Sequence, residues 1–115
     1  MTDNDHMIPA KQPLDLIFDK LRSERERQDR LWGGPAHDDT HSDRDWISMI
    51  THYAAKAAPP PNATEWHKMN HFRRRMVIVA ALAVAALEWD DRRRAKKWRE
   101  WVDRKISESD TGYWG

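Results

Sequence analysis

A polar segment that begins at residue 37 holds the side chains best suited to bind a divalent metal ion. His37, Asp38, Asp39 and His41 supply two imidazoles and two carboxylates within five positions. Such groups are common ligands of divalent metals, so these residues are the predicted metal site, and a divalent metal ion is the candidate cofactor. The preceding Gly-Gly-Pro favours a loop, and Asp and Thr are also frequent in loops that lead into helices. A metal site and a capping loop are therefore both open interpretations.

Three consecutive arginines, Arg73, Arg74 and Arg75, open the longest helical pattern of the chain. Guanidinium groups match the geometry of phosphate oxygens, and free backbone amides at a helix N-terminus attract the same anions. Positive side chains at that end of a helix oppose its dipole, so the triplet has no evident structural purpose there. The triplet thus indicates contact with a phosphorylated ligand, and a solvated helix face is the alternative.

Two further charged segments each have a functional and a structural interpretation. In segment 24–28, Glu24 or Gln28 could project into a cleft shared with the histidine segment, or the whole segment could be a solvated helix face. Basic residues from 92 to 99 accompany Trp98 and Trp101, a pattern that can bind nucleic acid, but nearby Asp and Glu residues dilute the charge. A solvated face is favoured there, and nucleic acid is not an expected partner.

The composition excludes several classes of function. The 115 residues fit one domain, and the net charge is only +1 although 34% of the residues are charged, so general electrostatic binding of nucleic acid is not expected. The absence of cysteine excludes disulfides, zinc–thiolate sites and thiol nucleophiles. The N-terminus lacks the pattern of a signal peptide, and the longest apolar run, 12 residues over 76–87, is shorter than the roughly 20 residues of a membrane span. We therefore expect a cytoplasmic protein without membrane contact.

Two helical patterns with clear stop signals precede the long one. Apolar residues recur at three- and four-residue steps over 13–32, and the Gly-Gly-Pro at 33–35 ends that pattern. Ser42, with Asp45 three residues later, resembles a capping box and predicts a second helix from about Asp43. The three prolines that follow this second pattern stop it.

The longest pattern, about 72–106, centres on a segment that is apolar on every side, which is typical of a helix enclosed by other helices. A short helical piece at 65–69, capped by Thr64, precedes it. The charged stretch at 90–94 is where a break in the long helix is expected.

The chain is therefore predicted to be all-α, a bundle of three to five helices around one strongly apolar helix, about 72–90. We divide it into a flexible N-terminal arm, 1–12, a single helical domain, 13–106, and an irregular C-terminal tail, 107–115. Three amphipathic helices cannot easily enclose a helix that is apolar on every side. We therefore expect a homodimer or higher homo-oligomer to complete the bundle.

The order and spacing of these segments resemble a known superfamily over roughly residues 20–93. The matching pieces are Glu24 or Glu26 with Arg25, Arg27 and Gln28, then Trp32-Gly33, then His37, Asp38, Asp39 and His41, then Trp46, and then Arg73–Arg75 leading into Val77–Glu88. In these pieces the chain is similar to the MazG-like, all-α nucleoside triphosphate pyrophosphohydrolases, particularly to small proteins common in bacteriophage genomes. The resemblance implies a nucleotide-type ligand and a phage protein located in the host cytoplasm.

The resemblance also implies where an active member of that superfamily would carry its magnesium-binding carboxylates. Those positions hold His52, Tyr53 and Lys56 in one helix and Arg75 and Ile78 in the next, and none of these is a carboxylate. Lys56 and Arg75 would repel a divalent metal but could neutralise phosphates, and Tyr53 or a tryptophan could stack on a base. The resemblance thus implies a non-catalytic binder that sequesters a nucleotide or a nucleotide signal.

The predicted ligand-binding residues are polar and aromatic members of these segments. They are Glu24, Arg27, Gln28, Trp32, His37, Tyr53, Lys56, Arg73, Arg74 and Arg75. Two other functions stay open: a protein-interaction module that inhibits a host factor through exposed tryptophans, and a metal-dependent nucleotide hydrolase whose ligands have moved to Glu24 and the predicted metal site. A non-enzymatic role is favoured, and no residue is assigned a catalytic role.

Overall fold

Four helices and no strand make up the part of the chain that the structure describes, residues 10–112, with side chains described to residue 109. In the computed structural model they are α1 (Pro13–Trp32), α2 (Gly34–Asp38), α3 (Asp43–Ala55) and α4 (Glu65–Gly112). The predicted all-α class is confirmed. Residues 1–9 of the predicted arm and 113–115 of the predicted tail lie outside the described residues. No described helix combines the length and the apolar character needed to cross a bilayer.

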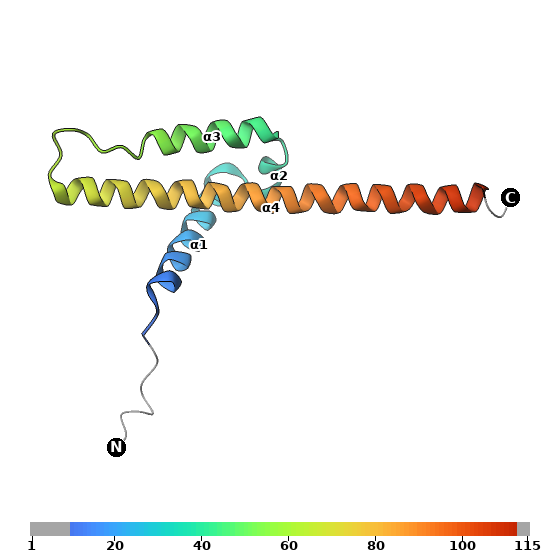
Figure 1. Ribbon diagram of the computed structural model, residues 1–115, viewed down its shortest axis with the longest axis horizontal. Coiled ribbons are helices and arrows are strands. Elements are labelled where there is room, and N and C mark those ends of the chain that lie inside the picture. The colour runs from blue at the N-terminus through green and yellow to red at the C-terminus, as the bar shows by residue number, and fades with distance from the viewer. Residues whose placement is uncertain (1–9, 113–115) are drawn as a thin grey trace, which may run out of the picture.

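α4 runs along the whole length of the molecule (Figure 1). α3 lies alongside its N-terminal half in the opposite direction, and α1 meets α4 near its middle at a steep angle. The C-terminal half of α4 projects beyond both of them. The radius of gyration is 22.0 Å, compared with about 13 Å for a compact domain of this length. One chain is thus an extended assembly of helices on a single long one.

α1 begins and ends at the residues that its sequence signals indicate. Pro13 occupies the first turn, where its missing amide hydrogen is not needed, and the Gln12 amide donates to the Asp15 carboxylate (3.3 Å). At the other end Gly33 adopts a left-handed conformation, φ 97°, and its amide donates to the Asp29 carbonyl (2.9 Å). α2 follows at once, so part of the segment expected to be a loop is a short helix.

The predicted capping box starts α3. The Asp45 amide donates to Ser42 Oγ (3.3 Å), and the Ser42 amide donates to the Asp45 carboxylate (2.8 Å). The next residue, Trp46, is only 4% exposed, and its ring packs against that of Trp89 on α4 with centroids 6.2 Å apart. The cap therefore fixes the start of α3 next to the side chain that anchors it to α4.

α4 begins at the predicted cap but continues without the predicted interruption. Thr64 Oγ1 accepts a hydrogen bond from the His67 amide (3.2 Å), which satisfies a free donor of the first turn. The short piece at 65–69 and the long helix are one element. They are continuous because no residue from 65 to 111 is a glycine or a proline.

The C-terminal half of α4 also differs from the prediction. The break expected near 90–94 is absent, because the Asp90 carboxylate pairs with both Arg93 and Arg94, three and four residues further along the helix. The segment 107–112, predicted to be irregular, is helical. Its apolar periodicity ends before residue 107, but a helix that has already formed continues until a breaking residue stops it.

One face of α4 forms the core. Seven residues at alternating steps of four and three face α1 and α3, and we call them the buried stripe: His71, Arg75, Ile78, Leu82, Ala85, Trp89 and Arg92. At its centre, Ile78, Leu82 and Ala85 are 6%, 1% and 3% exposed, as expected for a heptad seam. Leu87, on another face, is 64% exposed, so one chain does not enclose the apolar helix on every side. Completion by an oligomer stays a prediction.

We expect Trp46→Ala to lower the free energy of unfolding by about 3 to 5 kcal/mol, because it removes a buried indole and leaves a cavity between α3 and α4. Urea denaturation followed by circular dichroism measures this loss. The adjacent Ile47 is 64% exposed, so Ile47→Ala should cost far less. Equal losses in the two variants would contradict the described packing of α3.

Candidate ligand-binding pocket

A pocket of about 410 Å³ lies where α1, α2 and α3 meet α4. Leu82 and Ala85 of the buried stripe form its floor. Its walls are mostly polar and aromatic: Arg25, Gln28, Asp29 and Trp32 from α1, His37 and Asp38 from α2, His41 from the following loop, and Trp46, Ser48, Met49, His52 and Tyr53 from α3. An apolar floor with convergent polar groups on the walls is typical of a small-molecule site.

α1 contributes one helix face to the pocket. Arg25, Gln28, Asp29 and Trp32 are spaced at three, four and seven residues, which places them on the same side of the helix. Sequence reasoning selected Gln28 and Trp32 but missed Arg25 and Asp29 as pocket residues, although this spacing was readable. His52 and Met49 of α3 were missed in the same way.

Gln28 is the most buried polar residue of the pocket, with 1% of its surface exposed. Its Nε2 donates to the Glu24 carboxylate (3.1 Å) and to the Ile78 carbonyl of α4 (3.4 Å). Its Oε1 is buried and has no hydrogen-bond partner among the described residues. An unpaired buried acceptor costs roughly 1 to 3 kcal/mol, a cost that a ligand with an N–H group would remove.

Two aromatic rings of the pocket wall, from different helices, form an adjacent pair. The rings of Trp32 on α1 and Tyr53 on α3 have centroids 6.5 Å apart and are inclined by 44°. His52 meets the Tyr53 ring edge to face at 5.3 Å. Rings held in this way by two different helices offer flat apolar surfaces on which a planar heteroaromatic group can stack.

Asp38 supplies a buried carboxyl group, only 7% exposed. Burial raises the pKa of Asp38 above its usual 3.8, and this effect outweighs the attraction of the nearby Arg25 guanidinium. Arg25 itself is held by Asp29 and by Glu88 of α4, each at 3.1 Å. The pocket therefore holds one carboxyl group that is more readily protonated than an exposed one, beside a fixed guanidinium.

The four predicted metal ligands do not converge on one point. His37 and His41 meet edge to face with centroids 4.9 Å apart, while the Asp39 carboxylate turns away and accepts from Arg92 (2.9 Å). Among the described residues, no three His, Asp or Glu side chains are grouped to hold a metal ion. Magnesium binding by His37, Asp38, Asp39 and His41 thus stays a prediction without a donor set in the structure.

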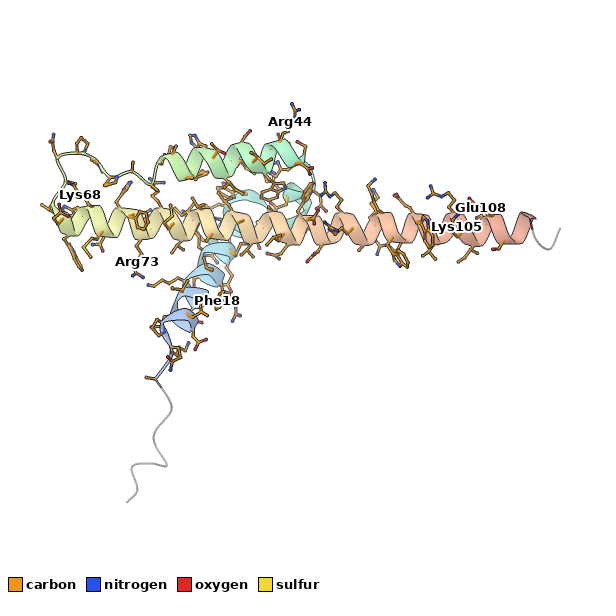
Figure 2. All side chains as sticks on the ribbon, in the orientation of Figure 1. Phe18, Arg44, Lys68, Arg73, Lys105 and Glu108 are labelled. Carbon is orange, nitrogen blue, oxygen red and sulfur yellow. The ribbon has the colours of Figure 1, made fainter. Side chains whose placement is uncertain are left out.

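The arginine triplet does not lie at a helix N-terminus, which corrects the expectation that free amides accompany it. α4 begins at Glu65, so Arg73, Arg74 and Arg75 lie two turns inside the helix, where backbone amides bond within the helix. Successive helical residues point about 100° apart, so the three side chains diverge. Arg73 points away from α3 (Figure 2), Arg74 is exposed, and Arg75 belongs to the buried stripe.

Two of the predicted phosphate-binding cations lie outside the pocket lining, Lys56 beside Tyr53 and Arg75 on the buried stripe. Lys56 Nζ is 5.7 Å from the centroid of the Tyr53 ring. The Lys56 carbonyl is hydrogen-bonded to His71 Nε2 (2.7 Å), one helical turn before Arg75 on the buried stripe. Arg75 is half-buried, and its Nε has no hydrogen-bond partner among the described residues.

The two remaining predicted residues play other parts. Glu24 bonds Gln28 from the adjoining turn and pairs with Arg27 (3.2 Å), so it orients the pocket amide rather than lining the pocket. Arg27 lies on a different surface of α1, beside Lys20 and Arg30. Of the ten predicted ligand-binding residues, the structure brings four into the pocket wall: Gln28, Trp32, His37 and Tyr53.

No protein-family model matches the chain, and no curated protein or solved structure is significantly similar to it. The resemblance to the MazG-like hydrolases therefore stays a prediction. Function is inferred from the pocket itself.

We expect Asp38→Asn to raise the free energy of unfolding at neutral pH. Because burial raises the pKa of Asp38 in the folded state, the ionised carboxylate destabilises that state above the raised pKa. Below pH 3.8 the carboxyl group is protonated in both states, so the advantage of the asparagine should disappear. Urea denaturation across this pH range measures the difference between the variant and the wild type.

Asp45→Asn is the matched control of opposite sign. Hydrogen bonds from Ser42 lower the pKa of Asp45, so this carboxylate stabilises the folded state above pH 3.8 and loses that effect as the pH falls through its lowered pKa. The variant should therefore be less stable than the wild type at neutral pH. A destabilising effect of the same kind for Asp38→Asn would contradict the buried position of that carboxyl group.

Proposed function

We propose that this protein binds a nucleotide or a closely related phosphorylated ligand and does not hydrolyse it. The observation that carries the proposal is the buried, unpartnered Gln28 Oε1 in a pocket walled by Trp32 and Tyr53. Aromatic faces and an unsatisfied acceptor together select a flat group with an N–H on its edge, which describes a nucleobase. The base would stack on an open face of one of these rings with its polar edge toward α1.

Lys56 and Arg75 are the residues proposed to contact the phosphates. Lys56 lies beside Tyr53, and Arg75 lies one helical turn after His71, which bonds the Lys56 carbonyl, so a base stacked on Tyr53 would direct its phosphates toward these two cations. Arg75 contributes a half-buried guanidinium with an unpaired N–H, and Lys56 a mobile point charge. Cations at this end would oppose a divalent metal there, which is why binding rather than metal-assisted hydrolysis is proposed.

The wider setting rests on the sequence resemblance alone. We propose on that basis a phage protein in the host cytoplasm that sequesters its ligand, which could be a nucleotide signal of the host. The protein is further proposed to act as a homo-oligomer.

Isothermal titration calorimetry against nucleoside mono-, di- and triphosphates and cyclic dinucleotides tests the proposal. One class should bind at micromolar concentrations, and Tyr53→Ala should weaken it about tenfold or more, because base stacking on an aromatic ring is worth roughly 1 to 3 kcal/mol. Arg75→Ala should weaken nucleotide binding by a similar factor. The control variant is Arg74→Ala, at the exposed neighbouring residue, and it should leave the affinity unchanged. The proposal would be contradicted if none of these ligands bound, or if the two arginine variants lost the same amount of affinity.

The same ligands distinguish the hydrolase alternative. The wild type should release no phosphate or pyrophosphate from a bound triphosphate in the presence of magnesium. Release that is abolished by both His37→Ala and Asp38→Ala would show a metal-dependent hydrolase and would overturn the non-catalytic role.

A protein-interaction role has one specific observation in its favour. The indoles of Trp98 and Trp101 on the projecting half of α4 are stacked, 5.1 Å apart, and 63% and 43% of these residues are exposed. Exposed aromatic pairs are frequent at protein interfaces. If a host protein bound through this pair, Trp98→Ala would abolish capture while leaving nucleotide binding unchanged.

A further inference from the structure

α4 carries a second heptad stripe on the side opposite the buried stripe. From Trp66 to Asp90 it advances in alternating steps of three and four through Met69, Arg73, Met76, Ala80, Ala83 and Leu87. We call it the open stripe. Its spacing is that of a coiled-coil seam, in which each such residue packs against a facing helix.

No described element of the chain covers most of this stripe. Trp66, Met69 and Leu87 are 67%, 62% and 64% exposed, and Ala80 and Ala83 at the centre are only half-buried. The five stripe residues from Trp66 to Ala80 also line a groove of about 590 Å³, whose other wall includes the apolar residues Ile17 and Leu21 of α1. A mostly apolar seam and the groove along its first half are thus left without a partner among the described residues.

The size of the uncovered surface fits a second copy of the chain. The accessible surface is 9329 Å², about 2,700 Å² more than the roughly 6,600 Å² of a compact monomer of 13.6 kDa. Part of the excess belongs to the projecting half of α4. Obligate homodimers bury roughly 1,000 to 2,500 Å² from each copy, which this excess can supply.

We propose that two copies pair through their open stripes with the α4 helices antiparallel. In the register centred between Ala80 and Ala83, Ala80 of each copy faces Ala83 of the other. The small side chains of these alanines allow the two helices to approach closely. The same register places Met76 opposite Leu87 and Arg73 opposite Asp90. Apolar residues therefore face apolar residues, and the charges that flank them face opposite charges.

The charges also exclude the parallel arrangement. In a parallel pair Arg73 would face Arg73, and Asp90 would face Asp90, so both charged layers of the seam would repel. The antiparallel register has a further consequence at the ends. It lays the segment 94–98 of one copy along Trp66 and Met69 of the other, so the projecting half of one α4 covers the exposed start of the second.

Charge reversal tests the register. The wild type should sediment as a dimer at micromolar concentration, and Arg73→Glu and Asp90→Lys should each weaken dimerisation by about tenfold or more, a loss of about 1.4 kcal/mol. The double variant, Arg73→Glu with Asp90→Lys, should recover most of the lost dimer affinity. Because Asp90→Lys also removes the pairs with Arg93 and Arg94, Leu87→Glu, which leaves those pairs intact, should abolish the dimer with helix content unchanged. A monomeric wild type would overturn the proposal.

Cysteine cross-linking tests the direction, and the chain has no cysteine of its own to interfere. A mixture of differently tagged Met76→Cys and Leu87→Cys chains should form mixed disulfides under mild oxidation. Disulfides within the Met76→Cys population alone would show a parallel pair and refute the antiparallel register. Arg44→Cys is the control, since Arg44 points away from α4 (Figure 2) and should not cross-link.

The dimer does not depend on the proposed ligand. The pocket floor lies on the buried stripe, so Leu87→Glu should remain able to bind the nucleotide if the pocket proposal holds. Calorimetry and sedimentation of this one variant therefore separate failure of the dimer from failure of the pocket.

Discussion

The length of α4 is the constraint on which the rest of the structure depends. Its 48 residues span about 72 Å at 1.5 Å per residue, whereas the 20 residues of α1 and the 13 of α3 span about 30 and 20 Å. Two short helices can cover only one face of one half of such a rod. That covered face provides both the core and the floor of the pocket, and the remaining surface is left to other molecules.

The pocket follows from the way in which the short helices meet α4. α1 and α3 each pack on α4 rather than on one another, so the space between them is bridged by side chains. The rings of Trp32 and Tyr53 bridge this space, and the small side chain of Ala85 leaves room above α4. Polar groups at the bottom of such a space are costly unless they are bonded. Gln28, whose donor is satisfied and whose acceptor is not, is therefore difficult to explain by packing alone.

Local features could be predicted from the sequence, because single residues determine them: Pro13, Gly33, Ser42 and Thr64 each mark a helix end where the structure has one. The extent of α4 could not, since apolar periodicity reports burial and the last helical turns are not buried. The site was predicted in part. Arg73, Arg74 and Arg75 were treated as one basic cluster at a helix N-terminus, whereas α4 starts eight residues earlier and helical geometry points the three side chains in different directions.

The joint between α1 and α2 consists of two glycines, Gly33 and Gly34, with φ of 97° and 67°. Trp32, on the α1 wall of the pocket, and His37, on the α2 wall, lie on the two sides of this joint. No side chain fills the joint, so the separation of the two walls is set by a few backbone torsions rather than by packing. Any residue with a Cβ would be strained there. Substitutions in the pocket walls are therefore tolerated far more easily than substitutions at the two glycines that join them.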